Sequence, residues 1–157
     1  MLSLGFDVFG QPAPQGSVRA FVQGGRAVVT SDNKKLRPWR DSVAWAAREA
    51  LGKHRERLAF PLTGPVALRI EFWLHRPKNR SKTVDVLPMV PPDLDKLARA
   101  VGDSLVNAGV IMDDSLIVDI RMTKRYAVSP ALPKIYVYGF HRHEPCAVVW
   151  VEQKSHA

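Results

Sequence analysis

Four aspartates form two close pairs, Asp93 with Asp95 and Asp113 with Asp114, in a chain whose formal net charge is +8. Carboxylates gathered at one point repel one another and raise at least one pKa unless a cation neutralises them. Hard divalent cations take oxygen ligands, and Mg²⁺ commonly combines a few carboxylates with waters and phosphate oxygens. Such a site on a basic surface suits phosphodiester hydrolysis, because the metal polarises the phosphate and lowers the pKa of a bound water.

Each aspartate also has a simpler structural explanation. Asp93 follows two prolines and precedes an apolar-periodic run, which is typical of a helix N-cap. Asp95 would lie in the first helical turn, where the helix dipole favours a carboxylate, four residues before Arg99 at ion-pair spacing. Asp113 and Asp114 could simply form a polar turn. Taken singly, these explanations are favoured, so the geometry of the whole segment has to decide.

The segment between the two aspartate pairs predicts one amphipathic helix over residues 93–107. Its apolar side chains recur at helical spacing: Leu94, Leu97, Ala98, Val101 and Leu105. Gly109 is well placed to turn left-handed after the last helical turn. The helix would be about 21 Å long, and the roughly seven residues after it could extend over about 23 Å. The second aspartate pair can therefore return beside the first if the following strand packs along the helix.

The remaining chain predicts a single small α/β (α+β) domain over residues 1–157, with a mixed β-sheet and two principal helices. The first helix should run from Lys35 or Pro38 to about Leu58. Alternating apolar residues and turn signals predict strands over residues 2–9, 18–22, 26–30, 66–74, 116–126, 134–140 and 146–152. The residues Gln23-Gly24-Gly25 should form a hairpin turn.

Composition limits the partners and the compartment. A sequence pI near 10.0 points to an anionic partner, most often nucleic acid, although a basic protein without such a partner fits the charge equally well. The single cysteine, Cys146, excludes an intrachain disulfide and favours a cytoplasmic location; its apolar neighbours favour burial over reactivity. No apolar run approaches the roughly 18 residues that span a bilayer, so no membrane partner is expected.

A basic loop follows the strand predicted over residues 66–74. Its four cations are Arg76, Lys78, Arg80 and Lys82, and the loop has no core-forming side chain. Such a loop can follow a phosphate backbone, while a solvent-exposed loop without a ligand explains it equally well.

These residues together resemble the RusA-type Holliday-junction resolvases. The resemblance is carried by the run Asp93-Leu94-Asp95-Lys96-Leu97, Arg99 and Asp103 on the same helix, the Asp113-Asp114 turn, and the strand end Lys124-Arg125-Tyr126. It is strongest over residues 91–126 and weaker over 8–20, where Pro12 to Ser17 is similar to the family's N-terminal loop.

The resemblance implies a homodimeric, Mg²⁺-dependent endonuclease without an organic cofactor that cuts four-way DNA junctions in recombination and repair. Mn²⁺ is expected to substitute for Mg²⁺. The matching catalytic and metal-holding carboxylates would be Asp93, Asp95 and Asp114. Arg99 stands where family members often carry lysine; it can stabilise phosphate charge but cannot give up a proton.

Other residues would bind DNA or support the site. The implied phosphate contacts are Arg76, Lys78, Arg80, Lys82, Lys124 and Arg125, and the supporting residues are Asp113 and Asp103. A four-way junction has approximate two-fold symmetry, which a closed dimer with two matching sites would meet. Two other hypotheses stay open. The chain could be a nuclease for other branched DNA, or a non-catalytic basic nucleic-acid-binding module whose carboxylates are caps and turns.

Overall fold

The computed structural model describes residues 3–16, 18–31, 33–54, 60–80, 86–128 and 142–154. Its elements in chain order are β1 (Ser3–Phe9), β2 (Val18–Gln23), β3 (Arg26–Ser31), α1 (Leu36–His54), β4 (Val66–Leu74), α2 (Leu94–Ala108), the 3₁₀ turn η1 (Asp114–Leu116), β5 (Ile117–Tyr126) and β6 (Cys146–Gln153). The strand predicted over residues 134–140 lies outside the described residues, as do residues 55–59 at the predicted end of the first helix.

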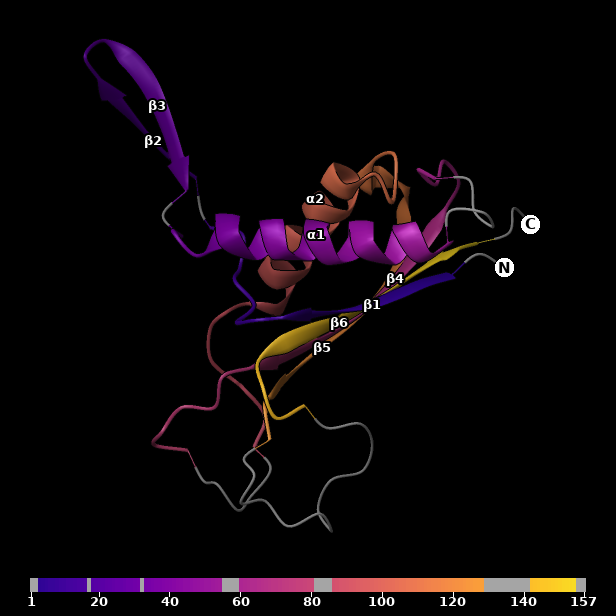
Figure 1. Ribbon diagram of the computed structural model, residues 1–157. Helices are drawn as coiled ribbons and strands as arrows, with labels where there is room; N and C mark the ends of the chain where they lie inside the picture. The colour runs from indigo at the N-terminus through magenta and orange to yellow at the C-terminus, as the bar shows by residue number, and fades with distance from the viewer. Residues whose placement is uncertain are drawn as a thin grey trace.

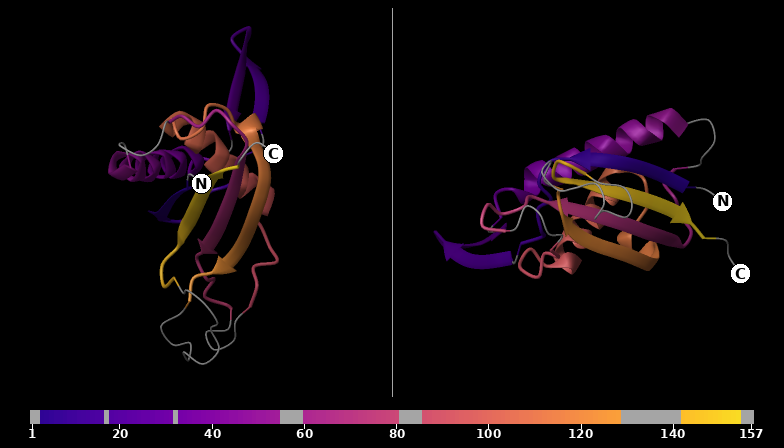
Figure 2. Two further views of the ribbon diagram at one scale, coloured as in Figure 1. Left: turned by 90° about the vertical axis from the view of Figure 1, so that its right-hand side faces the viewer. Right: turned by 90° about the horizontal axis from the view of Figure 1, so that it is seen from below.

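Four strands form the main sheet, in the order β1-β6-β4-β5. β6 pairs antiparallel with both β1 and β4, whereas β4 and β5 are parallel. The parallel pair needs a crossover connection, and α2 supplies it. Figures 1 and 2 show both helices on the same face of this sheet, which we call the helix-covered face; we call the opposite one the outer face. The predicted mixed sheet with two principal helices is confirmed.

The core lies between the helix-covered face and the two helices. Alternate residues of β4, from Val66 through Ile70 to Leu74, are buried in this core. α2 contributes Leu97 and Leu105 from its apolar stripe. Burial of each such aliphatic side chain is worth about 1.5–3 kcal/mol, so the strict alternation of β4 and the helical spacing of α2 fix how the two pack.

The ends of α2 follow the capping rules. Asp93 is the N-cap residue, with extended backbone at φ −68° and ψ 139°. Gly109 follows the last turn with φ 75°, the left-handed conformation that glycine adopts without steric cost. The helix therefore runs from Leu94 to Ala108, one residue later at both ends than the sequence predicts.

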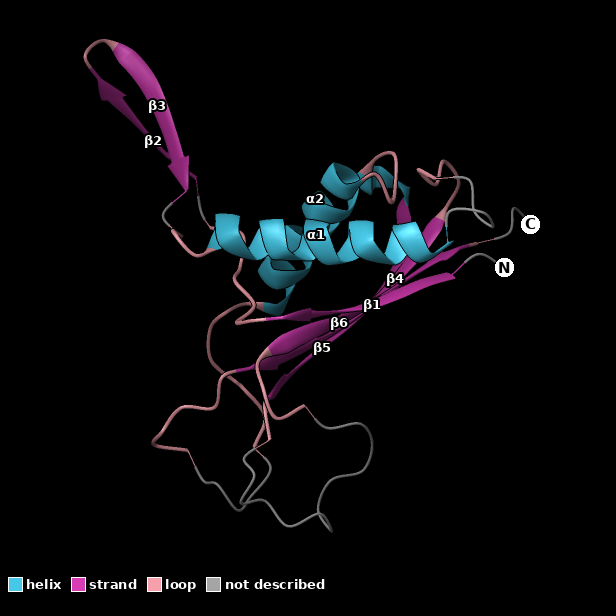
Figure 3. Cartoon of the chain, viewed as in Figure 1, coloured by secondary structure: helices cyan, strands magenta, loops and turns pink. Residues whose placement is uncertain are grey.

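β2 and β3 form a separate two-stranded sheet that extends away from the main domain (Figures 1 and 3). Gly24 and Gly25 make the turn, both with positive φ, while Gln23 still belongs to β2. The predicted hairpin is therefore confirmed, with a turn one residue shorter. None of the helices in the described ranges is long and apolar enough to cross a membrane.

Candidate active site

A hollow of about 230 Å³ lies between α2 and β5. Its charged lining consists of Asp95 and Arg99 from α2 and Asp114 from η1. Its other lining residues are Leu68, Ala98, Gly102, Ile117, Ile120 and Met122. The chain after α2 thus brings Asp114 back to the same hollow as Asp95.

The spacing of α2 explains why its residues share the hollow. Asp95, Arg99 and Gly102 are separated by four and three residues, so they lie on one flank of the helix. A Cβ on Gly102 would lie 3.7 Å from Ile117 Cδ1, which is ordinary van der Waals contact. An alanine at this position would therefore fit between the helix and the start of β5 without displacing Ile117.

Asp93 lies at the mouth of α2 and is not among the residues that line the hollow. Its side chain makes no capping hydrogen bond, although its backbone has N-cap geometry. Its Oδ2 atom instead pairs with Lys96 Nζ at 3.2 Å, and both side chains are substantially exposed. The carboxylate is therefore not committed to holding the helix start.

Asp113 organises the turn that presents its neighbour, Asp114. Its Oδ1 atom accepts a hydrogen bond from Ser115 N at 2.9 Å. The hydrogen bonds from Ser115 lower the pKa of Asp113 below its usual range. Asp113 is thus the cap of η1, in keeping with the supporting role that the sequence predicts.

Asp103 lies on α2 but contacts the first helix. Its Oδ2 atom is 3.4 Å from Arg40 Nη1 on α1. A second link between the helices is made by Arg48, whose Nη2 atom donates to both the backbone and side-chain oxygens of Asn107 at 3.0 Å. Asp103 is therefore part of the α1–α2 contact and supports the site only through the placement of α2.

The carboxylates of Asp95 and Asp114 are both exposed on the hollow, and they are the oxygen donors best placed for a divalent cation. Mg²⁺ is often held by one or two carboxylates, with waters and phosphate oxygens completing its octahedron. The donor set suits such a partly hydrated ion. Within the described ranges, no group of three or more His, Cys, Asp or Glu side chains could hold a metal ion. The three-carboxylate site with Asp93 stays a prediction.

The cations predicted to contact DNA differ in their surroundings. Arg76 is half-buried, lies over the Tyr126 ring at 5.6 Å, and donates from Nε to Ala127 O at 3.4 Å. Lys78 and Arg80 are exposed in the turn after β4. Lys82 lies outside the described residues. Lys78 and Arg80 are thus the described members of this loop whose charge faces solvent.

Two neighbouring cations on β5 point to opposite faces of the sheet. Lys124 lies on the helix-covered face, and its Nζ atom donates to Val90 O and Pro92 O, both at 2.9 Å. Arg125 is exposed on the outer face, in register with Trp73 of β4. Sequence reasoning missed the carbonyl contacts of Lys124; the alternation of Ile120, Met122 and Lys124 was the available signal for its direction.

The N-terminal loop packs beside the first turn of α2. Gln15 N donates to Lys96 O at 2.9 Å, and Asn33 Nδ2 donates to Pro14 O at 2.9 Å. The loop that resembles the family's N-terminal loop therefore lies next to the helix start that carries Asp93 and Asp95.

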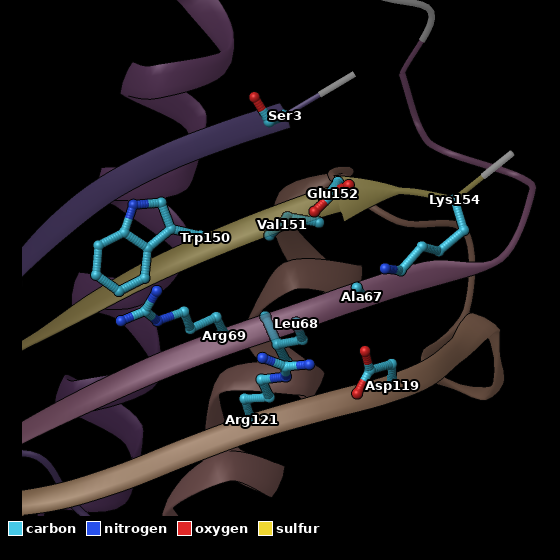
Figure 4. A pocket seen from close by; sticks show the side chains of 10 residues that line it. All are labelled: Ser3, Ala67, Leu68, Arg69, Asp119, Arg121, Trp150, Val151, Glu152 and Lys154. Atoms are coloured by element: carbon cyan, nitrogen blue, oxygen red, sulfur yellow. The ribbon is translucent and has the colours of Figure 1, made fainter. Parts of the chain in front are cut away.

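A second, larger hollow of about 410 Å³ lies on the outer face of the sheet (Figure 4). The Arg69 guanidinium lies 5.0 Å from the centre of the Trp150 ring there, and its Nη2 atom pairs with Glu71 Oε1 at 2.8 Å. Figure 4 shows Asp119 and Arg121 on the neighbouring strand, β5. This hollow contains none of the four aspartates at positions 93, 95, 113 and 114.

The fold and the hollow beside α2 define a small basic α/β protein that presents two carboxylates and a guanidinium on one surface. The family model of the endodeoxyribonuclease RusA matches residues 10–137. The chain therefore belongs to the RusA family of endodeoxyribonucleases.

Two relatives illustrate the range of similarity. The uncharacterized protein YqaN of Bacillus subtilis (strain 168) is 29% identical over 134 residues, covering 80% of this chain and 89% of the relative. The crossover junction endodeoxyribonuclease RusA of Escherichia coli (strain K12) is 33% identical over 100 residues, covering 64% of this chain and 66% of the relative. The second match thus spans slightly less than two thirds of the relative's length.

Proposed function

We propose that this protein is a Mg²⁺-dependent endodeoxyribonuclease that resolves four-way DNA junctions by paired phosphodiester hydrolysis, in DNA recombination and repair. The observation that carries the proposal is the meeting of Asp95, Arg99 and Asp114 on one hollow in a chain of the RusA family. The E. coli relative, named a crossover junction endodeoxyribonuclease, supports the junction as substrate.

The two carboxylates of the hollow would hold the cation, and Asp93 would join them from the helix mouth. The exposed ion pair of Asp93 with Lys96 is worth at most about 1 kcal/mol. It therefore only weakly opposes a rotation of the Asp93 side chain toward the cation. Bound Mg²⁺ supplies Lewis acidity toward the phosphate and a more acidic water. We expect Mn²⁺, which shares the preference for oxygen ligands, to substitute.

Arg99 acts as a fixed charge in this scheme. Its side chain lines the hollow with both carboxylates, and a guanidinium can bind two phosphate oxygens at once. It stays protonated throughout the physiological pH range, so proton transfer has to involve water or a carboxylate instead. Arg99 therefore stabilises the charge that accumulates on the phosphate during cleavage.

DNA would be held mainly through its phosphates. Lys78 and Arg80 are exposed on one loop, and Arg76 and Arg125 are the other described cations of the proposed contact surface. Lys82 lies outside the described residues and is included from the sequence alone. Contacts of this kind release counterions, so binding should weaken steeply with salt. A homodimer would supply two hollows for the two strands that must be cut, since one hollow per chain can only nick.

Cleavage of a synthetic four-way junction tests the proposal. With Mg²⁺ or Mn²⁺ we expect paired cuts, and with EDTA none. Asp95→Asn and Asp114→Asn should each slow cleavage by on the order of 10³-fold while leaving metal-free junction binding in place, because several kcal/mol of metal-dependent stabilisation is lost.

The controls separate the alternatives. A flap and a linear duplex of the same sequence should be cut far more slowly than the junction; equal rates on all three would remove the claim of junction selectivity. Parent-like cleavage by Asp114→Asn would remove the site assignment. Binding without cleavage under any metal condition would favour the non-catalytic nucleic-acid-binding module.

A further inference from the structure

Lys124 connects the end of β5 to the segment that leads into α2. Its ammonium donates to two backbone carbonyls of that segment, Val90 O and Pro92 O, at 2.9 Å each. Charge-assisted hydrogen bonds are stronger than neutral ones, and the half-buried position of Lys124 shields them partly from water. Two of the three ammonium donors are thus directed to the protein itself.

The segment held by Lys124 packs against the protein only in part, through buried Pro88 and half-buried Val86. Residues 86–93 form no helix or strand, and Leu87, Met89 and Val90 are exposed, with Met89 at 90%. Apolar burial of these side chains therefore contributes little to the placement of the segment. A polar tie to a rigid strand has correspondingly more influence on where the segment lies.

The position of the tie links the two halves of the site. Pro92 O belongs to the peptide group that begins Asp93, and α2 starts at the next residue. Lys124 lies on the same side of β5 as Ile120 and Met122, which line the hollow, and β5 follows directly from the turn that carries Asp114. One side chain thus ties the strand behind Asp114 to the helix start that carries the other carboxylates.

We propose that Lys124 is a positioning residue of the nuclease, which holds residues 86–93 against β5 so that Asp93 and Asp95 keep their place relative to Asp114. The proposal gives Lys124 this role in place of a phosphate contact, because two of its three ammonium donors are directed to carbonyl oxygens. The inference rests on the proposed nuclease function for its effect on cleavage, but not for its effect on the mobility of the segment.

The test compares Lys124→Met, which keeps the apolar stem, with Lys124→Arg, which keeps a charged donor. Hydrogen–deuterium exchange of backbone amides in residues 86–97 should rise in Lys124→Met and stay closer to the parent in Lys124→Arg. With Mg²⁺, Lys124→Met should lower kcat on a junction by about 10²-fold with little change in KM, since displacing a catalytic group by about 1 Å has an effect of that size. Lys124→Arg should recover part of the loss.

Salt dependence distinguishes positioning from DNA contact. In metal-free junction binding, Lys124→Met should keep the parent slope of log K against log[salt], whereas Lys78→Met should reduce it by about one. Arg121→Met, a change of the same type on the outer face of β5, should leave exchange, kcat and slope unchanged. Thermal melting of each variant confirms that it is folded.

Parent-like exchange over residues 86–97 in Lys124→Met would overturn the proposal, and so would a salt slope reduced as in Lys78→Met. If Lys124→Met does not fold, exchange and kcat in Lys124→Arg decide. Because the two hydrogen bonds depend on the geometry of the donor, Lys124→Arg should then show faster exchange and a lower kcat than the parent without losing cleavage. A parent protein that cuts no junction would remove the proposed function but leave the exchange result interpretable. Cleavage lost in Asp114→Asn but intact in Lys124→Met would remove only the role of Lys124.

Discussion

The helix-covered and outer faces of the main sheet are built from the same strands but carry different chemistry. On the helix-covered face, β5 presents Ile120, Met122 and Lys124 toward α2 and the hollow that holds the carboxylates. On the outer face, the same strand presents Asp119 and Arg121 to the larger hollow of Figure 4.

The difference lies in where each face finds partners for its charges. On the outer face, Arg69 pairs with Glu71 of its own strand, β4. It also lies over Trp150, its register partner on the neighbouring strand, β6. On the helix-covered face, two carboxylates from separate elements converge beside Arg99. The candidate active site is therefore not the larger of the two hollows, which lies on the outer face. Charged side chains from several elements meet at both hollows. The smaller hollow is distinguished because its charged residues, Asp95, Arg99 and Asp114, are those that the sequence motif singles out.

Two arginines on opposite faces give the sharpest test of this comparison. Arg99→Met should slow junction cleavage by about 10²- to 10³-fold, the effect of removing one donor that stabilises developing charge. Arg121→Met removes the same charge from the outer face and should change the rate by less than a factor of two. Single-turnover cleavage at saturating Mg²⁺ measures both. Equal losses in the two variants would mean that the outer face also takes part in catalysis.

Two adjacent residues of β4 test how each face contributes to stability. Leu68, fully buried at 2% exposure, lies below the hollow, and Leu68→Ala should lower the free energy of unfolding by about 2–5 kcal/mol. Arg69 points to the outer face, and Arg69→Ala should cost about 1 kcal/mol or less, because the Arg69 side chain is 62% exposed. Urea unfolding followed by circular dichroism measures both. A loss in Arg69→Ala that matched Leu68→Ala would show that the outer face is part of the core.

The reactivity of Cys146 tests whether the buried part of the outer face stays closed to solvent. Cys146 packs with Trp73, Val128 and Val148 in a small buried cluster, and burial raises the pKa of its thiol to about 11. At pH 8 the reactive thiolate is then on the order of one part in 10³, so labelling by a thiol reagent should be about 10²-fold slower than for a free cysteine. The labelling rate should rise tenfold per pH unit below pH 11. Rapid labelling at pH 8 in the folded protein would show that this cluster opens.

Local patterns predicted much of the fold. The alternation in Val66–Leu74 and the periodicity over Leu94–Ala108 located β4 and α2 to within one residue, and Gly109 ended the helix as expected. These features depend on residues close in sequence, where backbone propensity and side-chain period act directly. The predicted start of β5 at Leu116 was one residue early, because Asp113 caps a 3₁₀ turn that includes Leu116.

The sequence predicted which residues form the candidate site, but not the contacts that they make. Residue type and spacing singled out Asp95, Arg99 and Asp114, which line one hollow. The same reasoning placed Asp93 at the helix start but did not give the ion pair of its carboxylate with Lys96, or that of Asp103 with Arg40 on another helix. Nor could it find that Lys124 is directed to Val90 O and Pro92 O, since contacts between distant segments leave no periodic signal.

By itself, the sequence determined the chemical types available for a site, the helix that spaces Asp95 from Arg99, and the basic character of the whole chain. Only the tertiary structure decided that Asp114 lines the hollow, that Asp93 is not part of its lining, and that Lys124 faces carbonyl oxygens. The physical reason is that spacing along one element fixes which face a side chain takes. Which partner it meets there depends on the parallel pairing of β4 with β5 and on the packing of α2 across them.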